Sequence, residues 1–122
     1  MSDFEEMAMR KLSAHLSTTY SSIATACAAL PIPVIIPTGA VSNLEAVPAM
    51  RRVLALAADQ PMPELHQAEL FGAAAHWLGA MDSYSLLIRE EFHEARTYSA
   101  AANLIAADGA VMDLAVWLAD NS

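Results

Sequence analysis

Glu90 and His93, in the stretch EEFHEAR, are the residues whose types and spacing come closest to a chemical site. On a helix, residues three apart lie on one face, and a Glu-x-x-His pair of this kind holds iron in di-iron carboxylate bundles. Such a bundle needs two of these pairs and two more glutamates, whereas this chain has one pair. A symmetric dimer would supply the second pair, with Glu64, Glu69 or Glu94 as further ligands. The simpler interpretation is a polar pair on an exposed helix face.

The remaining polar residues predict no catalytic set. His66 and Glu69, three residues apart near an expected helix start, are interpreted as a surface pair, and His76 as a packing residue beside Trp77. Cys27 is the only cysteine and stands among alanines, which indicates a small core residue in a reducing cytoplasm. No serine lies in a G-x-S-x-G turn, and no glycine-rich loop follows a strand. The sequence therefore predicts a protein that is not an enzyme and holds no cofactor.

Apolar residues are in excess, at 56% of the chain against 16% charged, and they include seven Met and two Trp. Met, Trp and Tyr are frequent at surfaces that bind other proteins. Trp77, Met81, Tyr84 and Ile88 recur at helical spacing, so we predict that they bind a partner protein. The alternative for each of them is an ordinary place in the core.

Residues 31–41 interrupt the helical pattern with an uncharged segment that contains three prolines. Proline cannot stay in a helix interior, so this segment is predicted to be an extended arm. Its aliphatic run, Val34, Ile35 and Ile36, would promote aggregation if it were exposed. The arm is therefore expected to pack on its own helices, to cross to a second copy, or to bind another partner. We include these three residues in the predicted protein-binding set.

The elements that position these residues are predicted to be helices, because alanine is abundant and glycine is scarce. Residues 64–107 are expected to form either one long helix or two antiparallel helices, 64–80 and 83–107, which break near Gly79. One inward-facing stripe is expected to run along them: Trp77, Met81, Tyr84, Ile88, Ala95, Tyr98, Ala102 and Ile105. The other predicted helices span 3–30, 42–59 and, after Asp108-Gly109, 110–120. We thus predict one all-α domain, residues 1–122, a small bundle of four to five helices with one arm.

The net charge of −8 argues against binding to nucleic acid, whose phosphates need Lys and Arg. Nine of the 14 acidic residues but only two of the six basic ones lie in residues 63–122. This half is expected to present a solvated acidic face, a docking face for a basic partner or a mimic of DNA, although no dense ladder of carboxylates supports the last. Residues 12–44 are long enough to span a bilayer, but the prolines break the helix and no Lys or Arg cluster flanks it. We expect no membrane segment and a cytoplasmic protein.

Three functions agree with these observations. The first is a small acidic helical homodimer that acts by occupying a partner protein's surface, as inhibitors, antiactivators and immunity proteins do. The second is a bundle that binds a metal or small ligand through Glu90-x-x-His93. The third is a structural or secreted protein: Trp77-Leu78-Gly79 resembles the W-x-G turn of small secreted helical-hairpin proteins. That resemblance implies a turn at these residues and a partner of similar size, and the proline arm departs from the two-helix plan.

Overall fold

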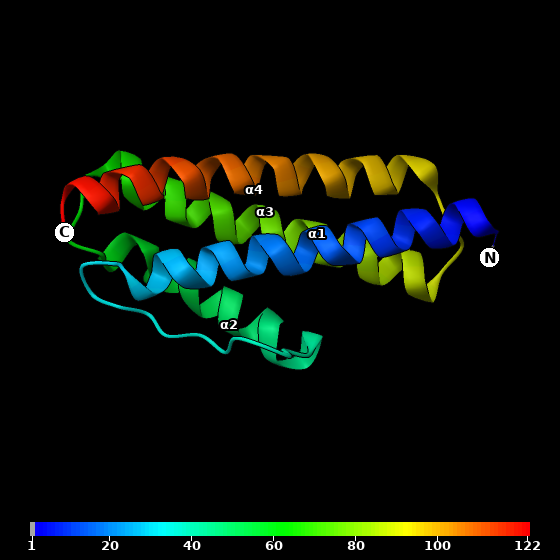
Figure 1. Ribbon diagram of the computed structural model, residues 1–122, viewed down its shortest axis with the longest axis horizontal. Helices are drawn as coiled ribbons and strands as arrows, with labels where there is room; N and C mark the ends of the chain where they lie inside the picture. Colours follow the sequence, from blue (N-terminus) through cyan, green and yellow to red (C-terminus); the bar gives the residue numbers. More distant parts are fainter. Residues whose placement is uncertain (1) are drawn as a thin grey trace.

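The computed structural model describes residues 2–122, and in this range it contains helices and no strand. Four α-helices follow one another along the chain: α1 (Asp3–Ala28), α2 (Asn43–Leu56), α3 (Glu64–Arg89) and α4 (Glu94–Asp120). A short 3-10 helix, η1 (Ala57–Asp59), extends α2 (Figure 1). The prediction of an all-α bundle is confirmed.

Helix α1 begins at a capping box, in which the Ser2 hydroxyl accepts the Glu5 N–H and the Glu5 carboxylate accepts the Ser2 N–H. The hydroxyl-rich stretch STTYSS does not break the helix. Thr18, Ser22 and Thr25 donate their hydroxyls to carbonyls one turn earlier, so these side chains are satisfied within the helix. The face of α1 that packs on the core includes Leu16, Tyr20, Ile23 and Cys27, and Leu30, just after the helix, is buried as well.

The chain turns between α3 and α4 at residues 90–93, so the predicted break near Gly79 is wrong. The helix dipole makes an acidic side chain unfavourable near the C-terminus of a helix and favourable near the N-terminus. Arg89 closes the last turn of α3 and Glu94 opens the first turn of α4, as this rule requires. The predicted stop at Asp108-Gly109 is also wrong, because both residues lie inside α4.

Gly79 lies inside α3, next to Asn103 of α4. A Cβ atom at this position would lie 3.4 Å from the side-chain nitrogen of Asn103, which is an ordinary van der Waals distance. The penalty of about 1 kcal/mol for glycine in a helix interior is too small to break a helix that packs against α1, α2 and α4. Tertiary packing overrides the local preference that predicted a break.

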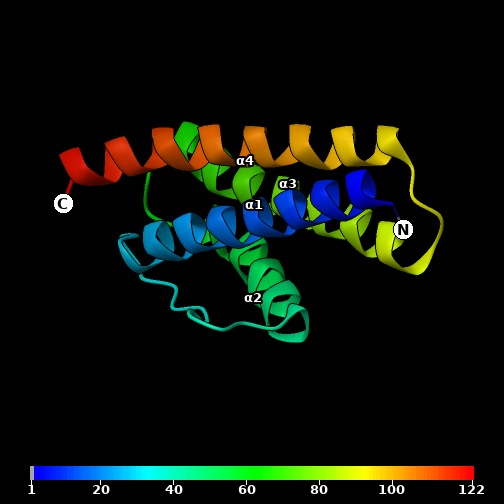
Figure 2. The same cartoon turned by 45° about the vertical axis from the view of Figure 1, so that its right-hand side comes forward.

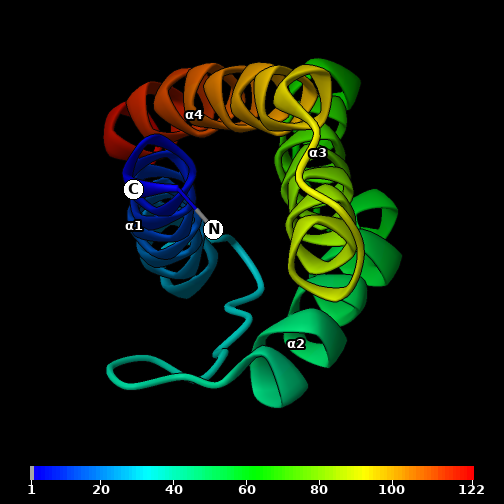
Figure 3. The ribbon, with the colours of Figure 1, turned by 90° about the vertical axis from the view of Figure 1, so that its right-hand side faces the viewer.

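Figures 2 and 3 show how the helices are arranged around the core. Helix α4 lies over both α1 and α3, while α2 packs against α3 on the side away from α4. The segment that joins α1 to α2 runs along the remaining side. None of the other helices within residues 2–122 covers the outer side of α4.

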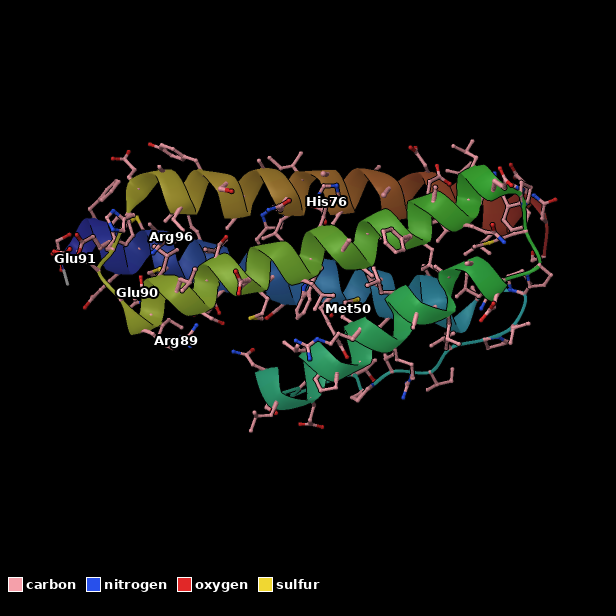
Figure 4. All side chains as sticks on the ribbon, turned by 180° about the vertical axis from the view of Figure 1, so that it is seen from behind. Met50, His76, Arg89, Glu90, Glu91 and Arg96 are labelled. Atoms are coloured by element: carbon pink, nitrogen blue, oxygen red, sulfur yellow. The ribbon has the colours of Figure 1, made fainter. Side chains whose placement is uncertain are left out.

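Trp77 lies at the centre of the core, where it is 2% exposed. Its indole nitrogen donates a hydrogen bond of 2.9 Å to the Leu16 carbonyl on α1, which satisfies its one polar atom. The ring of Tyr20 packs against it at a centroid distance of 5.6 Å. On the α2 side, Met50 is completely buried (Figure 4).

The segment between α1 and α2 is held by polar contacts to its backbone. The buried amide of Gln60 pairs with both backbone groups of Ile32: its Nε2 donates to the carbonyl at 2.8 Å, and its Oε1 accepts the N–H at 3.0 Å. The Tyr20 hydroxyl donates to the Pro37 carbonyl at 2.7 Å. Val34 and Ile36 are buried against the core of the same chain. Contact of this segment with a second copy stays a prediction.

Candidate protein-binding surfaces

The seven residues predicted to bind a partner do not form one surface. Trp77, Met81, Val34 and Ile36 are buried in the core, and Tyr84 is half-buried. Ile35 and Ile88 are exposed, but they lie on different elements. Of the predicted set, Trp77, Met81 and Tyr84 line one small cleft, and Met81 and Ile88 line a larger groove. A role for the whole set in binding stays a prediction.

This groove, of about 720 Å³, lies between α2 and the C-terminal half of α3, and we call it the α2–α3 groove. Its apolar lining comes from four residues, Val47, Leu78, Met81 and Ile88. Met81 forms the buried floor of the groove, Val47 and Leu78 are half-buried, and Ile88 is exposed, because α2 crosses α3 and covers only part of its C-terminal half. The volume is within the range of about 300–1,000 Å³ that is usual for binding sites.

The polar lining of the α2–α3 groove contains two arginines, Arg51 and Arg89, and one carboxylate, Asp82. Both arginines are exposed, and among residues 2–122 neither lies within ion-pair distance of a carboxylate. The groove is therefore locally basic in a protein whose net charge is −8. A partner with carboxylates would meet unpaired guanidinium groups here.

Glu90 and His93 do not share a helix face, so the basis for the predicted metal pair is wrong. Glu90 follows the last residue of α3, and His93 precedes the first residue of α4. The Glu90 carboxylate instead lies 3.6 Å from Nη1 of Arg96, across the turn (Figure 4). Among the described residues, no group of three His, Cys, Asp or Glu side chains is placed to hold a metal ion.

A small cleft lies beside the aromatic residues of the core, Tyr20, Trp77 and Tyr84. Its volume of about 100 Å³ is well below the usual range for ligand sites. Burial raises the pKa of the nearby Cys27 thiol to about 11, which keeps it protonated and unreactive at neutral pH.

The Trp77-Leu78-Gly79 triplet, which resembles the W-x-G turn of small secreted helical-hairpin proteins, lies within α3. The turn that this resemblance implied is therefore wrong.

Asp108 forms a polar link that sequence reasoning missed. Its carboxylate accepts the Thr19 hydroxyl at 2.7 Å and the Nε2–H of His15 at 2.7 Å, which joins α4 to α1. His15 and Thr19 are one helical turn apart, so both face the same point on α4. That spacing was visible in the sequence, but nothing in it indicated that Asp108, 89 residues after Thr19, lies opposite.

Two further histidines, His76 and His66, also form structural contacts. His76 donates from Nδ1 to the Asn103 side-chain oxygen at 2.8 Å and so joins α3 to α4 (Figure 4). His66 bonds Glu69 as predicted from their spacing, but the pair is mostly buried, because the His66 ring stacks on Trp117 at 4.8 Å. In none of these pairs is a nucleophile hydrogen-bonded to a base, so they support no catalytic set.

Helix α4 has an unusual composition for its position. Among the described helices it alone is long and apolar enough, by length and composition, to cross a membrane. Only 28% of its most apolar 18-residue window is buried. Much of its apolar surface therefore faces outward.

No family model, no curated protein and no solved structure matches this chain. The function of this protein is therefore inferred from its own residues and geometry.

Proposed function

We propose that this protein is a non-enzymatic binding protein that acts by occupying the surface of another protein, as inhibitors, antiactivators and immunity proteins do. The observation that carries this proposal is the α2–α3 groove, where an apolar lining meets two unpaired arginines. An amphipathic helix suits such a groove, because its apolar face fills the lining and carboxylates beside that face pair with the guanidinium groups.

The two arginines determine which kind of helix fits. Arg51 comes from α2 and Arg89 from the end of α3, so the charges stand on both helices that form the groove. Planar guanidinium groups bind carboxylates through two parallel hydrogen bonds. The expected partner segment therefore carries Asp or Glu next to Leu, Ile, Met or Phe at helical spacing.

A selection from a library of displayed peptides tests this proposal without knowledge of the natural partner. Peptides selected on the folded protein should be amphipathic and acidic. Ile88→Asp should weaken their binding by at least about tenfold, because it removes an apolar contact and adds a repelling charge. Arg51→Glu should act in the same direction.

Met112→Asp is the matched control, because it adds the same charge at another exposed apolar residue, which lies on α4 outside the groove. It should leave the affinity of the selected peptides unchanged. If no peptides are enriched, or if the selected peptides bind the Ile88→Asp variant as well as the original protein, the groove is not a binding site.

A further inference from the structure

The outer side of α4 carries a continuous apolar seam that the rest of the chain does not cover. Its members alternate at spacings of four and three: Tyr98, Ala102, Ile105, Gly109, Met112, Val116 and Ala119. We call this set the outer seam. All seven residues are exposed, and the four largest, Tyr98, Ile105, Met112 and Val116, are between 63% and 69% exposed.

The same helix has a second seam on its opposite side. Six residues with the same alternating spacing are buried against α1 and α3: Ala100, Leu104, Ala107, Val111, Leu114 and Leu118. Apolar residues that alternate at four and three are the pattern by which helices pack along one another. On the inner side this pattern has its partner helices. On the outer side it is present over three heptads without one.

Charge is absent from the outer seam itself. Asp108 lies next to Gly109, but its carboxylate is directed to α1, where it bonds His15 and Thr19. The Tyr98 hydroxyl at the start of the seam donates to the Glu94 carboxylate one turn earlier. A helix that packs on this seam would therefore bury no carboxylate from its members.

The sizes of the residues in the seam indicate which helix fits. Large residues occupy one set of positions (Tyr98, Ile105, Met112), and between them lie Ala102, Gly109 and Val116. In an antiparallel pair of identical helices with its two-fold axis at residue 107, position i faces position 214 − i. Ile105 then faces Gly109, Met112 faces Ala102, and Tyr98 faces Val116. Each large side chain meets a smaller one, as close packing of two helices requires.

We propose that the outer seam binds the outer seam of a second copy in this antiparallel register, which makes the protein a symmetric dimer. A parallel pair would place Gly109 on Gly109 and Ala102 on Ala102, which leaves voids between layers of large side chains. The antiparallel pair also opposes the two helix dipoles. This surface is separate from the α2–α3 groove, so the proposal does not depend on the proposed function.

The size of the seam predicts a reversible dimer. Residues 98–119 span about 32 Å, and a contact about 10 Å wide covers about 320 Å² on each copy, whereas a standard interface buries about 800 Å² per partner. A mostly apolar groove of about 720 Å³ between α1 and the C-terminal half of α4 shares Met112 and Ala119 with the outer seam. In the proposed register it receives Tyr98 of the second copy and enlarges the contact. Dissociation in the micromolar range is expected.

A lipid surface is the other apolar environment that such a helix could meet. Helices that lie in a membrane surface carry Lys and Arg on their polar side. Arg96 is the only basic residue of α4, and the exposed Asp113 and Asp120 lie beside the C-terminal half of the seam. These carboxylates repel anionic lipids, so the charges favour a protein partner.

Sedimentation velocity of the full chain over about 1–300 µM tests the dimer. We expect a shift toward twice the chain mass of 13.0 kDa as the concentration rises. Ile105→Lys should weaken association by at least about tenfold. Ile35→Lys is the matched control, with an equally exposed isoleucine in the α1–α2 segment, and it should associate like the original protein. Circular dichroism checks that both variants keep their helices.

Gly109→Leu separates a packed interface from simple apolar association. An added Cβ at Gly109 meets nothing within 4 Å in the monomer, so the variant should fold. It makes the seam more apolar but fills the space for Ile105 of the second copy, so dimerisation should weaken.

Cysteine crosslinking tests the antiparallel register. Ala106→Cys lies near the two-fold axis and should form a disulfide-linked dimer on mild oxidation, whereas Ala119→Cys lies far from the axis and should not.

Four results would overturn the proposal: a monomer at every concentration, loss of the dimer with Ile35→Lys rather than Ile105→Lys, stronger association of Gly109→Leu, or crosslinking of Ala119→Cys alone. Flotation with vesicles of phosphatidylcholine and phosphatidylserine tests the alternative that the outer seam binds a lipid surface. Binding to vesicles that Ile105→Lys abolishes, in a protein that stays monomeric, would assign the seam to a membrane instead. Peptide binding in the α2–α3 groove should be unaffected by Ile105→Lys, so the two proposals can fail separately.

Discussion

Replacing Asp108 by alanine should destabilise the protein, although the side chains of Asp108 and its partner His15 are both partly exposed. The perturbation removes the acceptor of two hydrogen bonds that join α4 to α1. Thr19 is fully buried, so the loss of Asp108 removes the partner of a hydroxyl that water does not reach. The His15 side chain, by contrast, is 32% exposed and regains water when its partner is removed.

The magnitude follows from these two environments. A hydrogen bond to a charged group contributes about 1.5–3 kcal/mol, and the partly exposed contact between His15 and Asp108 adds less than about 1 kcal/mol. The higher helix propensity of alanine returns about 0.5 kcal/mol. The net loss for Asp108→Ala is therefore about 2 kcal/mol, which lowers the melting temperature by about 8 °C in a chain of this length.

Urea unfolding of four proteins measures this coupling: the original chain, Asp108→Ala, Thr19→Val and the double variant. The double variant should lose about 1–1.5 kcal/mol less than the sum of the single losses, because the same bond is removed in both. Asp113→Ala is the control on the same helix, and since Asp113 is exposed its effect should stay within about 0.5 kcal/mol. Additive losses, or an Asp108→Ala variant as stable as the Asp113→Ala control, would refute the reasoning.

Gly72→Ala, where an added Cβ meets nothing within 4 Å inside α3, should raise the free energy of unfolding in urea by about 1 kcal/mol, and a decrease would show an unrecognised contact. Gly39→Ala should lower it by about 1 kcal/mol, because Gly39 has a φ of 83°, and an unchanged value would contradict this. The Cys27 thiol, whose pKa burial raises to about 11 from 9.0, should react with DTNB at pH 8 no faster than the protein unfolds. Because the unfolded thiol ionises first, its contribution to stability is complete below pH 9 and should be lost as the pH rises toward about 11; Cys27→Ala should remove this part of the pH dependence. Gln60→Leu should increase the rate of hydrogen exchange at the Ile32 amide by about tenfold or more, because it removes the acceptor of that N–H. Hydrogen exchange followed by NMR measures this rate, and an unchanged rate would show that Gln60 does not hold the segment in place.

The sequence predicted those parts of the fold that depend on local chemistry. The starts of α1 and α2 carry serine capping boxes, and the three prolines of residues 31–41 keep that segment out of the helices, whereas Pro48 lies near the start of α2. The break between α3 and α4 was missed because Gly79 was judged by its propensity alone. A signal for the true position was present: the buried stripe that includes Trp77 and Leu87 reaches Glu91 and Glu94, which cannot continue it.

The stripe predicted for α4 was the wrong one. Tyr98, Ala102 and Ile105 were expected to face inward in phase with Trp77, but they lie on the exposed side of α4. The buried residues are those two positions later, Ala100, Leu104 and Ala107, which belong to the second seam of this helix, the inner seam. Both seams satisfy the same periodicity, and only the turn at residues 90–93 sets the phase of α4 relative to α3. The α2–α3 groove was beyond prediction for a similar reason, because it depends on how α2 crosses α3.

The two seams of α4 also determine which substitutions this helix would tolerate under different selection. A screen for soluble, folded protein would detect only the inner seam, and it would accept lysine or glutamate at Ile105 or Met112 with little penalty. A screen that requires association would exclude the same changes. Subtracting one map of tolerated substitutions from the other would therefore separate the positions of α4 that the fold needs from those that a second molecule needs.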